Sequence, residues 1–332
     1  MKILIFLLII IGLIVGIYAW PSYQKSNDLK NKGDTLVKEG KFEEAILYYK
    51  DAQSTFPLRR DIADSANAAQ LLLSSNLEYG QITEQTYAEV QTAPPVEELP
   101  KITLKSNEFF VPILMYHHIR INPRPQDRVW VSLNVTSEQL DAQLNYLATH
   151  NYHVITLDDL YNALTKGGAL PENPIILSFD DGYRNFYDNA YPILKKHNMK
   201  AIEFIITAVE GANAYLTWDQ ISEMYKSGLV EFGAHTQHHP NLPDLSTTMI
   251  NNEITLSKSD LESHLGKPIK WFAYPYGGYN NYIENEVQKA GYLGAVSTIY
   301  GGVQSKDKLY LLPRIGVSGA FSLDEFARRV RR

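Results

Sequence analysis

The feature that most constrains the fold is an alternation of short apolar runs and amphipathic helical stretches from about residue 107 onward. Strands are expected at Val111–Tyr116, Ile175–Phe179, Ile202–Thr207, Leu229–Gly233, Trp271–Tyr274 and Leu293–Val296. Helices are expected at Ser137–His150, Trp218–Ser227, Ser246–His264 and Tyr279–Ala290, with Gly228, Gly266 and Gly291 placed where helices end. The alternation predicts an α/β fold with a parallel sheet or a (β/α) barrel. In both architectures, active sites lie at the carboxyl ends of the strands.

The composition of the chain narrows its function. The chain has 332 residues, a formal net charge of −6 and no cysteine. The acidic balance argues against a nucleic-acid-binding protein, which normally carries a basic patch. The absence of cysteine excludes disulfides, thiolate metal sites and cysteine nucleophiles. Any metal must therefore be held by His, Asp or Glu side chains.

The chain starts with an apolar run, Ile3 to Trp20, that contains no charged residue. At about 1.5 Å per residue, a helix of this length just spans a hydrocarbon core of about 30 Å. A cleaved signal peptide is the alternative, but no clear small-x-small cleavage site follows. We therefore predict an uncleaved transmembrane anchor at residues 1–21. Lysines flank the run on both sides, so the positive-inside rule does not orient it. The function argued below places the body outside the cytoplasm, as a single-pass cell-membrane protein.

Residues 22–90 form a second region, which is expected to be a small all-α module. Small residues at Gly33, Ala45 and Ala52 permit two helices to approach closely, and Tyr49 fills the space between them. This pattern resembles a tetratricopeptide repeat, although about three such units are usually needed for stability. A helical stalk and a docking surface for a protein partner are the two interpretations.

A linker rich in proline and acidic residues marks the boundary between the two regions. It covers residues 91–106 and favours an extended spacer. Further helices are expected before it, over residues 58–88. The last predicted domain then covers residues 107–332.

Two acidic residues end one of the predicted strands. The apolar run from Ile175 leads into Asp180-Asp181-Gly182. Adjacent carboxylates at this edge are well placed for catalysis, but neighbouring side chains of a strand point to opposite sides. A bend, which Gly182 permits, is needed for both to serve one site. An acidic turn is the structural alternative.

A histidine cluster ends another predicted strand, in Phe232-Gly233-Ala234-His235-Thr236-Gln237-His238-His239. His235 and His239 are spaced so that one turn of chain brings both imidazoles to one face. Two imidazoles and one carboxylate form a hydrolytic metal site with open positions, and Asp181 would complete it. The alternative is a surface histidine cluster. This ligand set accepts zinc, and also iron, cobalt or nickel.

Two further strand ends carry polar or turn-forming residues. Met115-Tyr116-His117-His118 offers a histidine that can act as a general acid, or a structural histidine pair. Tyr274-Pro275-Tyr276-Gly277 leaves its strand through a turn whose backbone N–H groups can face an oxyanion, or forms a simple aromatic loop. Tyr183, Trp218 and Tyr279 are aromatic candidates for lining a substrate groove, with core packing as the alternative.

Together the four strand ends resemble the NodB-homology polysaccharide deacetylases, carbohydrate esterase family four, over roughly residues 110–320. The resemblance implies a distorted (β/α) barrel, with Asp180 as catalytic base and Asp181 as a metal ligand. It implies His235 and His239 as the other two ligands. It also implies that the backbone N–H of Tyr276 contributes to an oxyanion hole.

The chain departs from the family pattern in three places. Ala273 stands where the third motif usually carries the arginine that orients the catalytic base, and Arg314 is a candidate replacement. The fourth motif's aspartate is not evident near Gly291, and no histidine follows His264. The pattern is similar to the poly-N-acetylglucosamine deacetylase branch, and this similarity implies that His117 is the general acid.

The expected function is metal-dependent removal of acetyl groups from a cell-surface polysaccharide, either poly-N-acetylglucosamine or peptidoglycan. Two alternatives remain open on sequence. A degenerate deacetylase fold could bind glycan as a scaffold without turnover, as Ala273 and the missing late histidine suggest. An O-acetyl esterase could use the same residues.

Overall fold

A computed structural model describes residues 21–22, 24–36, 39, 41–55, 104, 107–124, 126–209, 211–212 and 214–331. The chain divides into two compact units. The smaller unit contains the described residues up to Thr55, together with 126–130, and the larger unit contains the remainder. The predicted anchor before Pro21, the helices over 58–88 and nearly all of the linker lie outside the described residues. Within the described residues, no helix is both long and apolar enough to cross a bilayer.

The smaller unit contains a pair of helices, residues 24–36 and α2 (Phe42–Thr55). The ring of Tyr49 lies against Gly33, where any Cβ would collide with it. The Tyr49 hydroxyl donates to Asp34 at 2.8 Å, and the Ser26 hydroxyl donates to the Ala52 carbonyl at 2.7 Å. The predicted close packing of the helices is therefore confirmed. The assignment of the pair as a tetratricopeptide-like repeat stays a prediction.

The larger unit has strands and helices with the following bounds. The strands are β1 Glu108–Phe110, β2 Ile113–Tyr116, β3 His118–Ile119, β4 Asn134–Val135, β5 His153–Val154, β6 Pro174–Asp181, β7 Ala201–Ile205, β8 Val230–Ala234, β9 Trp271–Ala273, β10 Gly294–Tyr300, β11 Val303–Ser305 and β12 Leu312–Gly316. The helices are α4 Arg128–Leu133, α5 Ser137–Thr149, α6 Leu157–Lys166, α7 Tyr191–His197, α8 Trp218–Lys226, α9 Thr247–Leu265, α10 Asn281–Lys289 and α11 Leu323–Val330. α4 begins in the segment assigned to the smaller unit.

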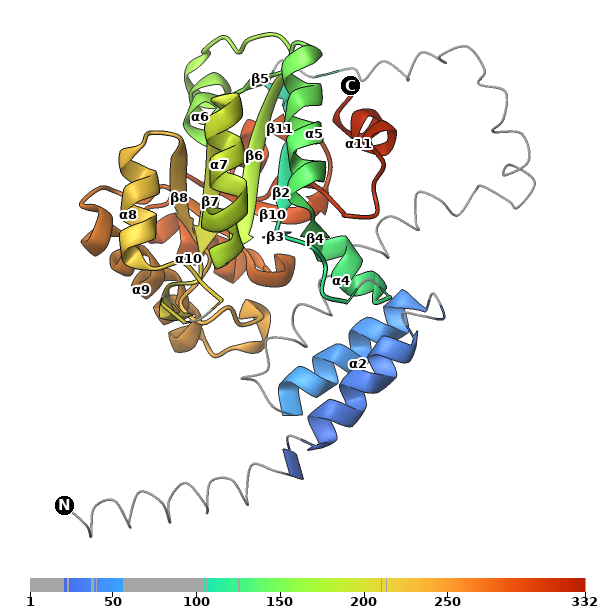
Figure 1. Ribbon diagram of the computed structural model, residues 1–332. Coiled ribbons are helices and arrows are strands. Elements are labelled where there is room, and N and C mark those ends of the chain that lie inside the picture. Colours follow the sequence, from blue (N-terminus) through green and yellow to red (C-terminus); the bar gives the residue numbers. More distant parts are fainter. Residues whose placement is uncertain are drawn as a thin grey trace, which may run out of the picture. The chain divides into compact units, whose positions relative to one another are not determined.

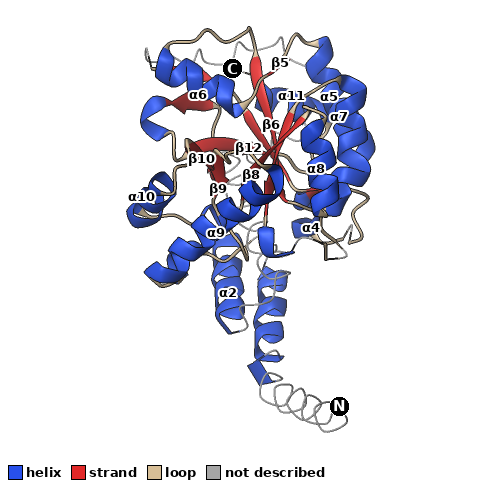
Figure 2. Cartoon of the chain, turned by 90° about the vertical axis from the view of Figure 1, so that its left-hand side faces the viewer, coloured by secondary structure: helices blue, strands red, loops and turns tan. Residues whose placement is uncertain are grey.

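Seven parallel strands of the larger unit close into a barrel. Their order is β6-β7-β8-β9-β10-β12-β2, and β2 pairs with β6 to complete the ring. Figure 2 shows these strands in the centre of the unit with helices around them. In Figure 1, α5 and α7 lie along the outside of β6. The (β/α) barrel is therefore confirmed, and all seven strands present their carboxyl ends at one rim.

Two apolar clusters show which strand side chains point into the barrel and which point toward the surrounding helices. The inner cluster includes Ile176 of β6, Phe204 of β7 and Leu312 of β12. The outer cluster joins strand residues such as Leu177 and Ile205 to the surrounding helices. Because side chains of a strand alternate, Ser178 and Asp180 share the inner face with Ile176, and Arg314 shares it with Leu312.

The helix ends follow the predicted signals. Thr136 is the N-cap of α5, accepts from the Gln139 N–H and forms a reciprocal capping box. Gly266 ends α9 in a left-handed conformation with φ 64°. The six predicted strands and four predicted helices are all present, with bounds shifted by a few residues. The sequence patterns did not predict β12, the helices α4, α6, α7 and α11, or the short strands β1, β3, β4, β5 and β11.

Candidate metal centre

Asp181, His235 and His239 meet at the carboxyl ends of β6 and β8, as predicted, and all three are buried. The Asp181 Oδ1 atom lies 3.4 Å from His235 Nε2 and 3.3 Å from His239 Nε2. The two Nε2 atoms are 3.1 Å apart. Three ligand-type atoms, each from a different side chain, therefore form a nearly equilateral triangle.

This triangle fits a divalent metal. Ligands about 2.0–2.1 Å from zinc at tetrahedral angles lie about 3.3–3.4 Å from one another, close to the measured separations. The other ring nitrogens are also engaged. His235 Nδ1 lies 2.8 Å from the Ala273 carbonyl oxygen, and His239 Nδ1 lies 2.9 Å from the Tyr276 hydroxyl. A carbonyl only accepts, so His235 carries its proton on Nδ1 and leaves the Nε2 lone pair for a metal.

The backbone of the centre adopts an uncommon conformation at four non-glycine residues. Asp181, Thr236, His239 and Tyr276 have φ of 82°, 64°, 59° and 59°. Each such residue costs of the order of 1–3 kcal/mol, and such residues concentrate at functional sites. At Asp181 the left-handed conformation is the bend that the paired acids needed. Asp180 stays on the inner face of β6 while Asp181 is directed to the histidines.

For both Asp180 and Asp181, burial raises the pKa of the carboxyl group and neighbouring groups lower it. Burial raises the pKa of Asp181, but the close approach of the His235 and His239 imidazoles outweighs it, so the pKa lies well below its usual range. Burial also raises the pKa of Asp180, and the charge and hydrogen bonds of Arg314 more than offset this, so its pKa is lowered. Both carboxyl groups are therefore ionised at neutral pH.

Arg314 of β12 pairs with Asp180 of β6 inside the barrel. Its Nη1 and Nη2 atoms donate to Oδ1 and Oδ2 of Asp180, at 2.7 Å each. Nη1 also donates to the Ser178 hydroxyl, and Nε donates to the Ser297 carbonyl. Arg314 is the largest fully buried side chain of the described residues. Arg314 therefore makes the contact with Asp180 that is expected of a replacement for the arginine missing at Ala273, and its role in orienting a catalytic base stays a prediction.

The histidine pair after β2 divides into two different environments. His118 is buried, its ring stacks on Tyr183 at 3.7 Å, and its Nδ1 lies 3.0 Å from the Asn185 amide nitrogen. His117 is partly exposed. Burial lowers the pKa of His117 below its ordinary value, although the charges of Asp181 and Asp180 act to raise it. His117 therefore lies within electrostatic reach of both acids and has access to solvent.

The turn after β9 lies beside the histidines. Pro275–Gly277 forms a tight turn, with Tyr276 in a left-handed conformation, in which the Gly277 and Gly278 N–H groups donate to the carbonyls of Tyr274 and Pro275. The ring of Tyr276 meets that of His239 edge-on at 4.6 Å. Tyr276 therefore lies beside the metal ligand His239 and contacts it through its hydroxyl group. The oxyanion role of its backbone N–H stays a prediction.

The three candidate sugar-binding aromatics have different surroundings. Tyr183 is buried between His118 and Tyr215. Trp218 stacks on His264 at 3.8 Å with nearly parallel rings. Tyr279 is 38% exposed, with its ring 6.0 Å from that of Tyr274. Tyr279 therefore has the exposed face that sugar contact requires, and the substrate roles of all three stay predictions.

Sequence analysis missed one acid beside the centre, Glu203 of β7. Its side chain is fully buried, and its Oε1 accepts the Gly182 N–H at 2.9 Å. Burial and the nearby Asp180 raise its pKa well above the ordinary value. The signal that could have identified it is a lone charge within the apolar run Ala-Ile-Glu-Phe-Ile.

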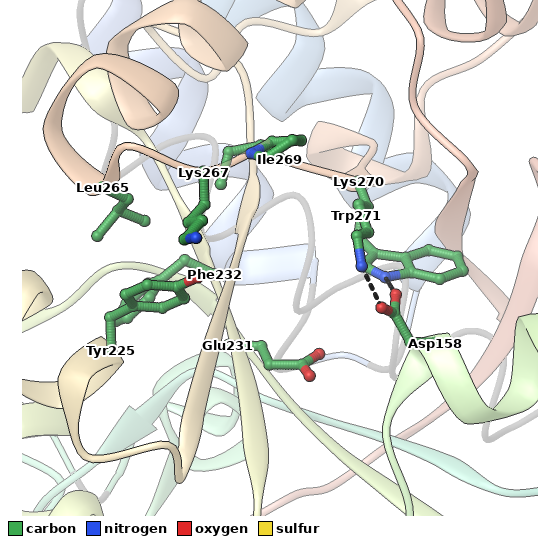
Figure 3. A pocket seen from close by; sticks show the side chains of 10 residues that line it. Asp158, Tyr225, Glu231, Phe232, Leu265, Lys267, Ile269, Lys270 and Trp271 are labelled. Atoms are coloured by element: carbon green, nitrogen blue, oxygen red, sulfur yellow. Dashed lines mark hydrogen bonds and ion pairs between the residues drawn. The ribbon is translucent and has the colours of Figure 1, made fainter.

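A separate cavity of about 230 Å³ lies away from the metal centre. Glu231 near the start of β8, Trp271 at the start of β9 and Asp158 of α6 line it, so it opens at the amino-terminal end of the barrel. Figure 3 shows Asp158 bound to Lys270 and to the Trp271 indole nitrogen, with Glu231 facing the same space. Burial, followed by the charge of Asp158, raises the pKa of Glu231 to about 7.

Comparisons with known proteins agree with this geometry. A sequence profile described as polysaccharide deacetylase matches residues 167–295. The poly-beta-1,6-N-acetyl-D-glucosamine N-deacetylase of Staphylococcus aureus is 35% identical over 213 residues, which cover 60% of this chain and 71% of that protein. The Streptococcus pyogenes deacetylase PplD, solved in complex with acetate, is 31% identical with a TM-score of 0.63 and covers 67% of this chain and 98% of its own. IcaB from Ammonifex degensii has a TM-score of 0.59 at 23% identity, covers 67% of this chain and 97% of its own, and shows the fold alone.

The chain belongs to the polysaccharide deacetylase family, carbohydrate esterase family four. With its Asp181, His235 and His239 site intact, it is an enzyme, a hydrolase that removes N-acetyl groups from a polysaccharide. The scaffold alternative rested on Ala273 and on the missing late histidine, and the pairing of Arg314 with Asp180 removes the first of these reasons.

Proposed function

We propose that the enzyme deacetylates poly-N-acetylglucosamine at a zinc centre held by Asp181, His235 and His239. The observation that carries the proposal is the buried triangle of ligand atoms, 3.1–3.4 Å apart, beside an ionised Asp180. The Staphylococcus aureus relative, named for poly-beta-1,6-N-acetyl-D-glucosamine, supports the substrate. Peptidoglycan and O-acetylated glycans are the competing substrates.

The side chains divide the reaction between them. Asp180 takes a proton from the water that attacks the acetamide carbon, and its pairing with Arg314 keeps it ionised and oriented. The Tyr276 N–H stabilises the oxyanion of the tetrahedral intermediate. His117 gives a proton to the leaving nitrogen as the C–N bond breaks. The products are acetate and a free sugar amine, so atoms and protons balance.

A divalent cation at this centre supplies a Lewis acid, which lowers the pKa of water and polarises a carbonyl oxygen. His235 and His239 are held for this purpose by the Ala273 carbonyl and the Tyr276 hydroxyl.

The proposed location is the outer face of the cell membrane. The uncharged run Ile3–Trp20 would anchor the chain, and a polymer substrate at the cell surface requires the barrel on that side. The helix pair at residues 24–55 would serve as a stalk or would bind a protein partner.

A substrate panel tests the proposed function. Acetate release is measured from β-1,6-linked N-acetylglucosamine oligomers, from peptidoglycan fragments and from O-acetylated sugars, at equal acetyl concentration. The proposal predicts the highest kcat/KM for the β-1,6 oligomers. Preference for peptidoglycan fragments would overturn the substrate, and preference for O-acetylated sugars would overturn the amide chemistry.

A further inference from the structure

The carboxyl group of Glu203 occupies an unusual position for a buried acid. It lies on β7 between Ile202 and Phe204 of the inner cluster, so by strand alternation it faces the outer layer with Ala201 and Ile205. It is fully buried, and its Oε2 atom has no hydrogen-bond partner among the described residues. Such groups are rare in native proteins, because an unsatisfied buried polar atom costs free energy. An apolar residue at this position would avoid that cost.

Among the described residues, the one hydrogen bond of the Glu203 side chain is to the bend that directs Asp181. Its Oε1 accepts the Gly182 N–H at 2.9 Å, immediately after Asp181. The Gly182 carbonyl accepts the Leu216 N–H, also at 2.9 Å. The bend is thus held by hydrogen bonds to both the N–H and the carbonyl of Gly182. The preceding residue, Asp181, has φ of 82°, a strained conformation that persists in a non-glycine residue only when the surrounding structure holds it.

Without the bend, Asp181 would not reach the histidines. Along a regular strand Asp180 faces inward, and Asp181 would face the outer helices. The left-handed conformation of Asp181 instead brings Oδ1 within 3.4 Å of both imidazoles. Groups that orient metal ligands typically change metal affinity or activity by 10- to 100-fold when removed.

We propose that Glu203 is a positioning residue of the metal centre, which fixes the Asp181–Gly182 bend through its hydrogen bond to the Gly182 N–H. This inference rests on the metal-dependent function proposed above. It assigns Glu203 no contact with substrate and no proton transfer.

Three substitutions at Glu203 test the hydrogen bond. Glu203→Gln keeps an acceptor at the same place, Glu203→Asp keeps the carboxyl group but shortens its reach, and Glu203→Leu removes the acceptor. Zinc Kd is measured on metal-free protein by competition with a chromophoric chelator, and the absorption spectrum of the cobalt form reports ligand geometry. Leu194→Ala, a fully buried change in α7, is the control for lost stability alone.

We expect Glu203→Leu and Glu203→Asp to raise the zinc Kd by roughly 10- to 100-fold and to change the cobalt spectrum. Glu203→Gln should stay within about threefold of the wild type, and Leu194→Ala should leave Kd unchanged. If Glu203→Leu does not fold, Glu203→Asp decides the question. Wild-type Kd in the Asp variant, or equal losses in the Gln and Asp variants, would overturn the inference. Failure of the wild type itself to bind zinc would instead overturn the proposed function.

Discussion

Arg314 donates to both carboxylate oxygens of Asp180, at 2.7 Å each, inside a closed barrel in which only β2 separates their two strands. β12 carries the arginine and β6 carries the aspartate, and both side chains are at least 97% buried. Two parallel N–H···O bonds fix the plane of the carboxylate as well as its charge. The pair therefore orients the base that the proposed reaction requires.

Removal of Arg314 should be costly, because it leaves the Asp180 charge buried and unpaired. We expect Arg314→Leu to lower the free energy of unfolding of the metal-free protein by roughly 3–5 kcal/mol, measured by urea denaturation. Adding Asp180→Asn to this variant should restore part of the loss, while both variants stay inactive. Simply additive losses in the double variant would show that the two residues do not stabilise each other.

His117 and His118 should respond differently to substitution. His117→Gln should reduce kcat by roughly 10²- to 10⁴-fold, because it removes the proposed general acid, with no change in zinc affinity. His118→Gln should mainly lower thermal stability, because His118 is buried against Tyr183. The opposite pattern in steady-state kinetics and thermal melts would assign the acid to His118.

The Tyr276 hydroxyl should contribute to metal affinity through His239. Tyr276→Phe removes the oxygen that lies 2.9 Å from His239 Nδ1, and we expect the zinc Kd to rise by roughly 10-fold or more. Tyr279→Phe is the matched control, since its ring is exposed and lies 6.0 Å from the ring of Tyr274. Equal zinc affinities for the two variants would show that the Tyr276 hydroxyl does not support His239.

Glu231 should make the stability of the enzyme depend on pH. Its pKa is about 7 in the folded protein against an ordinary value of 4.5, so between these pH values the folded state keeps a proton that the unfolded state has lost. Unfolding then releases a proton, and stability falls as pH rises through this window. Glu231→Gln should be more stable than the wild type at pH 8 by about 1–3 kcal/mol, and by less at pH 5. Exposed Glu172→Gln should show no such pH-dependent gain, and equal gains in both variants would contradict the role of Glu231.

The sequence predicted the metal trio because its ligands come from contiguous motifs at strand ends. The spacing of His235 and His239, and the acids after Phe179, are local patterns that parallel strands bring to one rim. The strands that form most of the barrel could be predicted from equally local patterns, since each is a short apolar run. The adjacent acids also indicated that a bend is needed, but they could not show that Asp181 itself adopts the left-handed conformation or which tertiary hydrogen bonds to Gly182 hold it.

The missed parts depend on contacts between distant segments. β12 reads Leu-Pro-Arg-Ile-Gly, and its proline and arginine hide the pattern of a buried strand. Arg314 is buried only because Asp180, 134 residues away, neutralises it. Glu203 is similar, because its single acceptor role is visible only once β6 and β7 are paired. Local sequence motifs therefore predicted the metal ligands and the adjacent acid, but they did not predict Glu203, which supports them from a distant segment.

The central claim, that Asp181, His235 and His239 hold a catalytic metal, is tested most directly by acetate release during zinc add-back. Metal-free wild type, Asp181→Asn and His235→Ala are assayed on N-acetylglucosamine oligomers as zinc is added, with circular dichroism to verify folding. The predicted result is that wild-type activity rises to a plateau at one zinc per chain while both variants stay inactive. Full activity of the metal-free wild type, or of a folded variant, would contradict the claim.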